Sequence, residues 1–274
     1  MILRQTGVFR NKTQPAIRNN RMIGKQKTAV VICAGGIGER MGAGMPKQFI
    51  EMADGTSIIR KTVDAFRTEA VRDLADIIVV TAPEGFEEET DRIVNRVSIA
   101  SAAAVSEKRA SKLDAEAHEP EPGADPELRY AHVITGGGQR QDSVRNALSF
   151  LSEQGFDDND IVLIHDGARP YVTSEVIRAV AKAACEKQAA IAAVPVKDTI
   201  RDIRDGTLDR SRLYSVQTPQ GFRFGLIRGA VEQAYEDGFY GTDDGSLAER
   251  CGVMPEIVEG SYSNIKITTP EDLK

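Results

Sequence analysis

The sequence predicts an α/β protein with a mostly parallel β-sheet and helices on both faces. Short apolar runs rich in β-branched residues recur along the 274-residue chain, and segments with helical periodicity lie between them. This alternation is typical of parallel strands joined by helical crossovers. The expected strands are residues 29–33, 77–81, 132–135, 161–165 and 190–194.

Helical periodicity is clearest in the segment that follows Gln141. Its apolar residues recur at the spacing i, i+3, i+4 and i+7, which places them on one face of a helix. They are Val144, Ala147, Leu148 and Leu151. We therefore expect a helix here that packs this face against the sheet.

The segment 1–27, which precedes the first strand, is rich in lysine and arginine and contains no acidic residue. It lacks the apolar core of a secretory signal and the serines of a transit peptide. We expect either a basic disordered tail or an upstream start, with Met22 as the alternative initiator.

A glycine-rich loop follows the first expected strand, over residues 34–47. Its glycines let backbone N–H groups approach a ligand with no Cβ in the way, which suits phosphate binding. The loop also carries two cations, Arg40 and Lys47, with Pro46 between them. Together these features predict a site for a polyanion such as a nucleoside triphosphate.

Other interpretations of this loop fit less well. A glycine run after a strand can be a simple turn, and that alternative stays open. A dinucleotide-binding fingerprint matches Gly36 and Gly38, but Met41 stands at its third glycine position and no acid ends the second expected strand. A P-loop would close with Gly-Lys-Ser/Thr, which is missing here. The triphosphate interpretation is therefore favoured over an NAD-dependent oxidoreductase.

Residues 101–129 interrupt the α/β alternation. The part 107–127 is rich in Glu, Asp, Ala and Pro, and Leu113 is its one large apolar side chain. A segment of this composition cannot bury enough apolar surface to order itself. We expect a surface insertion, with a functional acidic arm as the alternative.

Two further loops should lie beside the glycine-rich loop. The Gly-Gly-Gly run at 136–138 and the His-Asp-Gly-Ala-Arg-Pro run at 165–170 each follow an expected strand. Ligands of parallel α/β sheets bind at the carboxyl ends of the strands. Three segments distant in sequence should therefore meet in one crevice.

The pattern changes after residue 194. Apolar and polar residues alternate on both sides of Asp205-Gly206, which is a hairpin signal. A hairpin this long has little of its own domain to pack on. We therefore expect residues 197–217 to form an arm that lies against a second copy in a homodimer.

Composition argues against several classes of protein. Acidic residues outnumber basic ones by 41 to 35, for a net charge of −6, which disfavours a general nucleic-acid binder. The 3 cysteines and 3 histidines are scattered without metal-ligand spacing, which fits a reducing cytoplasm and argues against zinc. No apolar run approaches the roughly 18 residues of a membrane helix. We expect a cytoplasmic protein with neither nucleic-acid nor membrane partners.

A set of motifs between residues 28 and 274 stands in the order of a known family. They are residues 34–47, 136–144, 165–170, 194–199, 218–220, 242–244 and 264–268. In these motifs the chain resembles the cytidylyltransferases that make CDP-methylerythritol in the non-mevalonate isoprenoid pathway. The resemblance implies a Rossmann-like nucleotidyltransferase fold, a homodimer formed through the arm, and use of CTP, Mg²⁺ and a polyol phosphate.

The charges suit this chemistry. A phosphate oxygen of the acceptor attacks the α-phosphate of CTP, and this oxygen is already ionised near neutral pH. The reaction therefore needs neutralisation of anions and an in-line approach rather than a general base. No serine–histidine or cysteine–histidine nucleophile set is evident, whereas lysines and arginines stand at loop ends.

The resemblance implies a role for each site residue. The catalytic cations would be Arg40, Lys47 and Lys266, and Asp166 would hold Mg²⁺. The nucleotide-binding residues would be Ala34, Gly35, Gly36, Gly38, Gly137, Gly138, Arg140, Ser143 and Gly167. The acceptor-binding residues would be Arg169, Thr199, Arg210, Thr218 and Thr242, of which Thr199 and Arg210 come from the arm of the second copy. Asp243 and Asp244 are expected to be structural, as turn or cap acids.

The implied activity is conversion of CTP and 2-C-methyl-D-erythritol 4-phosphate to CDP-methylerythritol and pyrophosphate. One alternative is the related ribitol 5-phosphate cytidylyltransferase, which tends to place a bulkier apolar residue within the motif at 165–170. The other is a catalytically idle nucleotide-binding module. An idle module should have lost its cations, whereas Arg40, Lys47 and Lys266 are all present.

Overall fold

The computed structural model describes residues 26–36, 45–95 and 130–273. Outside the described residues lie most of the basic tail, the whole of the acidic insertion and part of the glycine-rich loop. Gly38 and Arg40 belong to that part of the loop. The predictions made for these parts stay predictions.

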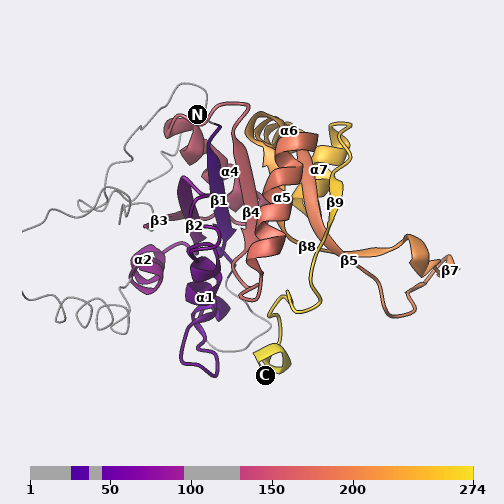
Figure 1. Ribbon diagram of the computed structural model, residues 1–274, viewed down its shortest axis with the longest axis horizontal. Helices are drawn as coiled ribbons and strands as arrows, with labels where there is room; N and C mark the ends of the chain where they lie inside the picture. The colour runs from indigo at the N-terminus through magenta and orange to yellow at the C-terminus, as the bar shows by residue number, and fades with distance from the viewer. Residues whose placement is uncertain (1–25, 37–44, 96–129, 274) are drawn as a thin grey trace, which may run out of the picture.

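A seven-stranded sheet forms the centre of the molecule (Figure 1). β8 is antiparallel to both of its neighbours, β4 and β5, and the other neighbouring strands of this sheet are parallel. The predicted mostly parallel sheet is confirmed. In spatial order the strands are β3 (Ala131–Thr135), β2 (Ile77–Ala82), β1 (Thr28–Cys33), β4 (Ile161–Asp166), β8 (Tyr214–Arg223), β5 (Ala189–Pro195) and β9 (Glu256–Glu259).

Two strands of this sheet, β8 and β9, were not expected from the sequence. β8 contains Pro219 and Gly221, which are unfavourable inside a strand. Gly221 is suited to its position because a Cβ there would lie only 2.9 Å from Leu163 Cδ2 and 3.0 Å from Ala184 Cβ. β9 is a short and mostly exposed edge strand. Neither strand has the continuous apolar run that marks the others.

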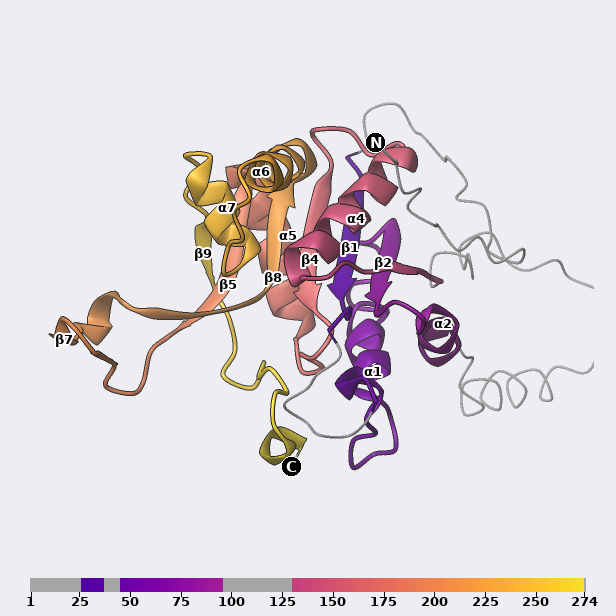
Figure 2. The same ribbon diagram turned by 180° about the vertical axis from the view of Figure 1, so that it is seen from behind.

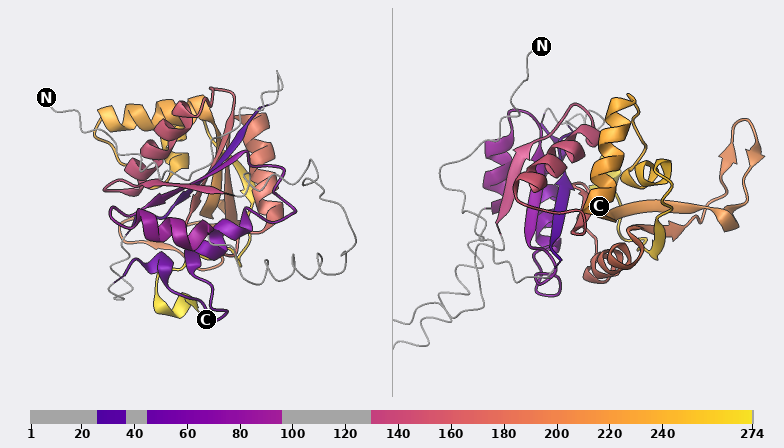
Figure 3. Two further views of the ribbon diagram at one scale, coloured as in Figure 1. Left: turned by 90° about the vertical axis from the view of Figure 1, so that its left-hand side faces the viewer. Right: turned by 90° about the horizontal axis from the view of Figure 1, so that it is seen from above.

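Helices cover both faces of the sheet (Figure 3). Side chains alternate between the faces along a strand. In β1, Val30 and Ile32 therefore join one core and Ala29 and Val31 the other. The first core packs against α1 (Ile58–Ala65), α2 (Glu87–Asn95) and α5 (Ser174–Lys187), and the second against α4 (Arg140–Glu153), α6 (Phe224–Glu236) and α7 (Asp244–Arg250).

The helix expected after Gln141 is α4, and its predicted apolar face is buried in the second core. Within the part of the chain that the structure describes, no helix has the length and apolar character needed to cross a membrane.

A β-arm projects from the sheet between β5 and β8 (Figures 1 and 2). Its hairpin pairs β6 (Arg201–Asp202) with β7 (Gly206–Thr207), and Gly206 takes a φ of 88°, which favours glycine. The expected hairpin turn at Asp205-Gly206 is thus found, but its paired strands are much shorter than the alternating pattern suggested. The arm is also shorter than the predicted range 197–217, because Tyr214 already pairs with Pro195 of β5.

Candidate active site

The candidate site lies at the carboxyl ends of β1, β3 and β4, where three motif segments meet. A Cβ on Gly35, after β1, would lie 2.9 Å from Ser143 Oγ of α4 and 3.7 Å from the Cα of Gly136, after β3. A Cβ on Gly167, after β4, would lie 2.9 Å from the Cβ of Ala34. Glycine is needed where these backbones approach one another. The described parts of the three loops therefore converge, as their positions at the carboxyl ends of parallel strands predicted.

Ser143 shapes the loop at 136–138. Its hydroxyl accepts a hydrogen bond from the backbone N–H of Gly137 (3.0 Å) and donates one to the carbonyl of Gln139 (3.2 Å). Gly137 has no room for a side chain, because a Cβ would lie 2.2 Å from that of Asp142. Gln139 and Asp142 form a capping box at the start of α4. The loop thus brings the N-terminus of a 14-residue helix to the crevice, a favourable place for an anion.

Asp166, the last residue of β4, is surrounded by three cations. Its Oδ1 accepts a hydrogen bond from Arg140 Nε at 3.1 Å, and its Oδ2 accepts one from Arg169 Nε at 3.3 Å. Lys266 Nζ lies 2.9 Å from the same Oδ2. The backbone N–H of Asp166 donates to Thr218 Oγ1 of β8 at 3.0 Å. Through its carboxylate and its N–H, Asp166 therefore connects its own loop to side chains from three other parts of the chain.

The neighbouring charges set the protonation of the cluster. Burial alone would raise the pKa of Asp166, but Arg140 and Lys266 hold it well below its usual range. Burial alone would lower the pKa of Arg140, but the carboxylate of Asp244 raises it. On β1, burial raises the pKa of the Cys33 thiol to about 12. At neutral pH the carboxylate of Asp166 is therefore charged, and it lies with its cations beside a protonated thiol.

His165, one residue before Asp166, is fully buried and electrically neutral. The carbonyl of Arg169, 3.1 Å from Nε2, can only accept, so in the neutral ring Nε2 carries the proton and donates to it. Nδ1 then accepts a hydrogen bond from Thr218 Oγ1, 3.1 Å away, and the same Oγ1 accepts one from the N–H of Asp166. Burial lowers the pKa of His165 to about 4. His165 therefore holds Thr218 and Arg169 in place and is not available as a general base.

The segment 264–268 completes the site from the C-terminal part of the chain. Lys47 Nζ donates a hydrogen bond to the carbonyl oxygen of Ile267 at 2.9 Å. The N–H of Ile267, which is fully buried, donates to the carbonyl of Ala168 at 2.8 Å. Lys266, the preceding residue, reaches into the cluster. Two of the predicted catalytic lysines are thus held by one short segment.

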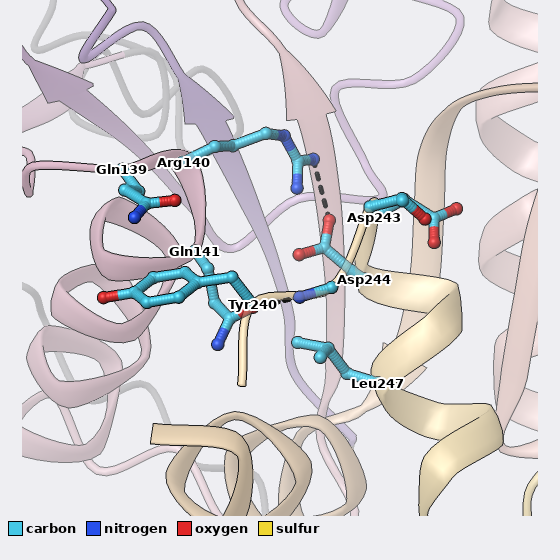
Figure 4. A pocket seen from close by; sticks show the side chains of 9 residues that line it. Gln139, Arg140, Gln141, Tyr240, Asp243, Asp244 and Leu247 are labelled. Atoms are coloured by element: carbon cyan, nitrogen blue, oxygen red, sulfur yellow. Dashed lines mark hydrogen bonds and ion pairs between the residues drawn. The ribbon is translucent and has the colours of Figure 1, made fainter. Parts of the chain in front are cut away.

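The predicted acceptor-binding residues lie in three places. Arg169 and Thr218 lie in the cluster around Asp166, and Thr242 lines a small pocket between α4 and α7 (Figure 4). Thr199 and Arg210 lie on the arm, where Arg210 Nη1 donates to the carbonyl of Lys197 at 2.7 Å. Because the arm projects away from the sheet (Figure 2), a single chain does not bring these two residues into the crevice.

Three buried polar residues support the site although the sequence suggested no binding role for them. Gln48 donates to the carbonyl of Ala34 at 2.5 Å, and Gln141 binds the connection between α6 and α7. Asp244 forms an ion pair with Arg140, with 2.7 Å between Oδ2 and Nη2. Each stands within two residues of a predicted site residue, which is the signal that could have found them. The expected capping role of Asp243 at α7 is confirmed.

The chain is similar to proteins of one family over most of its length. The family model described as "IspD: 2-C-methyl-D-erythritol 4-phosphate cytidylyltransferase" matches residues 28–274. A Bacillus cereus protein named 2-C-methyl-D-erythritol 4-phosphate cytidylyltransferase is 42% identical over 248 residues, covering 89% of this chain and 93% of that protein. A Syntrophus aciditrophicus protein of the same name is 37% identical over 254 residues, covering 91% and 94%.

Solved structures agree with the sequence relatives. The Francisella tularensis 2-C-methyl-D-erythritol 4-phosphate cytidylyltransferase is 28% identical with a TM-score of 0.66, covering 90% of this chain and 97% of that one. The Thermus thermophilus structure of the same name is 28% identical with a TM-score of 0.62, covering 90% and 96%. The chain therefore belongs to the 2-C-methyl-D-erythritol 4-phosphate cytidylyltransferase family.

Proposed function

We propose that the crevice transfers a cytidylyl group from CTP to 2-C-methyl-D-erythritol 4-phosphate and releases pyrophosphate. The observation that carries this proposal is the group of cations around Asp166, namely Arg140, Arg169 and Lys266. Lys47 binds the same C-terminal segment that carries Lys266. Cations so placed suit two phosphorylated substrates that must meet despite their like charges.

The reaction needs no general base. An ionised phosphate oxygen of the acceptor attacks the α-phosphorus of CTP, and pyrophosphate leaves with the electron pair of the broken P–O bond. Arg40, Lys47 and Lys266 would stabilise the charge that grows around the α-phosphate in the transition state. A neutral His165, with hydrogen bonds on both ring nitrogens, is consistent with this mechanism.

The nucleotide would bind against the two glycine loops. Gly36 and Gly138 are exposed at the crevice, and the N-terminus of α4 lies beside them. Backbone N–H groups without a neighbouring Cβ can approach phosphate and base closely. Arg140 and Ser143 would complete this half of the site, together with Ala34, Gly35, Gly137 and Gly167.

Asp166 would hold the Mg²⁺ ion that the family resemblance implies. Over residues 26–36, 45–95 and 130–273 no three His, Cys, Asp or Glu side chains gather as a metal cage. A single carboxylate still suits Mg²⁺, which is commonly bound by one or two carboxylates and substrate phosphates. When bound, Mg²⁺ would neutralise phosphate charge. Arg169 and Lys266, which contact Asp166 Oδ2, could then turn to the substrates.

The acceptor would bind to Arg169, Thr218 and Thr242, and to Thr199 and Arg210 from the arm of a second copy. The arm exposes apolar side chains, among them Ile203, which is 97% exposed. An exposed apolar surface of this kind suits contact with another protein surface. We therefore include a homodimer in the proposal, with the arm as the element that joins the subunits.

The proposed location is the cytoplasm. All three cysteines, Cys33, Cys185 and Cys251, are free thiols. Free thiols persist in a reducing compartment.

The first experiment is Mg²⁺-dependent release of pyrophosphate from CTP, with 2-C-methyl-D-erythritol 4-phosphate and ribitol 5-phosphate tested side by side. We expect release with the methylerythritol phosphate alone. Release with ribitol 5-phosphate alone would keep the nucleotide half of the proposal and replace the acceptor. Release with neither substrate would contradict the proposed activity.

A further inference from the structure

The guanidinium of Arg140 lies between two carboxylates that come from different elements. Nε donates to Asp166 Oδ1 of β4 at 3.1 Å, and Nη2 lies 2.7 Å from Asp244 Oδ2 of α7 (Figure 4). Asp244 is only 1% exposed, and Arg140 is its one ion-pair partner among the described residues. A buried carboxylate needs a cation nearby to offset its desolvation. The pair is therefore a specific feature of the interior rather than a surface contact.

Asp244 is held in place by residues on both of its sides. The side chain of Gln220, itself 1% exposed on β8, donates from Nε2 to Asp243 Oδ2 at 2.7 Å. Its Oε1 accepts a hydrogen bond from the N–H of Gly245 at 2.9 Å. One buried amide thus binds the residue before Asp244 and the residue after it. The carboxylate faces Arg140 from a position that the sheet determines.

The first turn of α4 binds the same connection. Gln141 donates from Nε2 to the carbonyl of Phe239 and accepts from the N–H of Gly241, each at 2.9 Å. Tyr240 donates its hydroxyl hydrogen to Asp142 Oδ1 at 3.1 Å. Three consecutive residues of α4, 140–142, therefore each contact the segment 239–244. These contacts hold the backbones of Arg140 and Asp244 in place relative to each other.

We propose that Asp244 is a positioning residue that directs the guanidinium of Arg140 toward the nucleotide. Arginine prefers two-point pairing with a carboxylate. Without Asp244, the guanidinium of Arg140 can rotate so that Nε and one Nη both pair with Asp166. It then no longer has the orientation that suits a ligand. Asp244 prevents this by binding Nη2. The inference rests on the proposed function, in which Arg140 binds CTP.

Positioning and simple electrostatics predict opposite results when the charge of Asp244 is removed. A site for a polyanion becomes more positive in Asp244→Asn, so long-range electrostatics alone would tighten CTP binding. Loss of the Arg140 orientation would weaken it. A role confined to stability would lower the melting temperature and leave the CTP affinity of the folded protein unchanged.

The experiment is calorimetric titration of CTP into the full chain without acceptor, for wild type, Asp244→Asn, Asp244→Glu and Asp237→Asn. We expect the Kd for CTP to rise about tenfold or more in Asp244→Asn, the loss of one charge-assisted contact. Asp244→Glu, which keeps the charge, should recover part of the affinity. Asp237→Asn is the matched control: it removes one carboxylate from the same connection, where Asp237 pairs with the exposed Arg250. Its Kd should match wild type.

A tightened or unchanged Kd in Asp244→Asn would overturn the proposal. A second measurement does not depend on CTP: rotation of the Arg140 guanidinium about its Nε–Cζ bond, followed by ¹⁵N NMR on a signal identified by its loss in Arg140→Lys. We expect slow rotation in wild type and faster rotation in Asp244→Asn, and equal rates would also overturn the proposal. Wild-type protein that binds no CTP would refute the proposed function, while the rotation rates would still decide whether Asp244 positions Arg140.

Discussion

At the scale of single residues, the site is a set of charges that hold one another in place. Asp166 stays ionised because cations surround it, and those cations stay ordered because Asp166 and Asp244 bind them. Neutral His165 holds two neighbouring groups by hydrogen bonds, the carbonyl of Arg169 and the hydroxyl of Thr218. An arrangement formed before substrate arrives costs little reorganisation during reaction. The rate should therefore depend on individual charges at the reacting phosphates.

Lys47→Ala and Lys266→Ala should each lower kcat by about 10²–10³-fold, and the KM for CTP should change much less. The reason is that the charge these lysines face grows in the transition state. The measurement is steady-state pyrophosphate release with both substrates varied. Lys182→Ala, which removes an exposed lysine of α5, is the control. Normal turnover by both site variants would remove the two lysines from catalysis.

His165 should make the stability of the protein depend on pH between about 6.5 and 4. The unfolded histidine takes up a proton in this range, whereas in the folded protein burial lowers its pKa to about 4. The unfolded state then binds more protons, so the free energy of unfolding falls as the pH falls, by about 3 kcal/mol between pH 6.5 and 4. Urea unfolding at several pH values should show this loss in wild type. In His165→Gln the free energy of unfolding should lack this pH dependence, and an equal pH dependence in both proteins would contradict a neutral buried His165.

At the scale of elements, loops and strand ends that are far apart in the chain build the site together. β8 is the reversed strand of the sheet, and its reversal brings Thr218 to the edge where the parallel strands β1 and β4 end. The C-terminal segment reaches the same edge because Ile267 is buried with Met52, Ile58 and Ala168. This small apolar cluster lies outside the two main cores. Attachment of the segment should therefore affect activity as well as stability.

Ile267→Ala should lower both the melting temperature and kcat. Removing a fully buried isoleucine side chain costs about 2–5 kcal/mol, and here the loss falls on the segment that holds Lys47 and Lys266. Thermal unfolding and steady-state kinetics at a temperature where the variant is folded would test this. Ile265→Ala, at a position that is 39% exposed, should change neither quantity appreciably. A destabilised Ile267→Ala variant with normal kcat would show that the segment is not needed to place the lysines.

At the scale of the whole molecule, the protein is a cytidylyltransferase whose fold and family are established, and the arm is the part whose proposed role depends on a second chain. One chain holds Arg169, Thr218 and Thr242 near the crevice, but Arg210 lies on the projecting arm. If the proposed dimer forms, each active site contains residues of both subunits. Two variants with defects in different parts of the site should then restore activity when their chains form a mixed dimer.

Arg210→Ala should raise the KM for the acceptor and leave that for CTP unchanged. Arg204→Ala, at the exposed hairpin turn, should alter neither constant. When Arg210→Ala chains are mixed with Lys47→Ala chains and allowed to exchange, each mixed dimer should contain one site with an intact Lys47 and an intact arm. At low acceptor concentration, activity should recover to about a quarter of the wild-type value, as random pairing in a two-fold dimer requires. No recovery despite proven exchange would place Arg210 outside the partner's site.

The sequence by itself determined the strands with continuous apolar runs, the helix after Gln141, the turn at Asp205-Gly206 and the convergence of the glycine loops. Each of these follows from a short local pattern, because side-chain periodicity and backbone freedom act over a few neighbouring residues. The family could also be recognised from motifs in order.

Only the tertiary structure decided which strands are neighbours and which charges meet. β8 lies between β4 and β5 with Pro219 and Gly221 in it, against its local propensity, because packing against the neighbouring strands and α5 outweighs that propensity. Asp244 looked like an ordinary helix-cap acid, yet its carboxylate reaches Arg140, which lies far earlier in the chain. Pairings of this kind depend on how distant elements pack in three dimensions, and no local pattern encodes them.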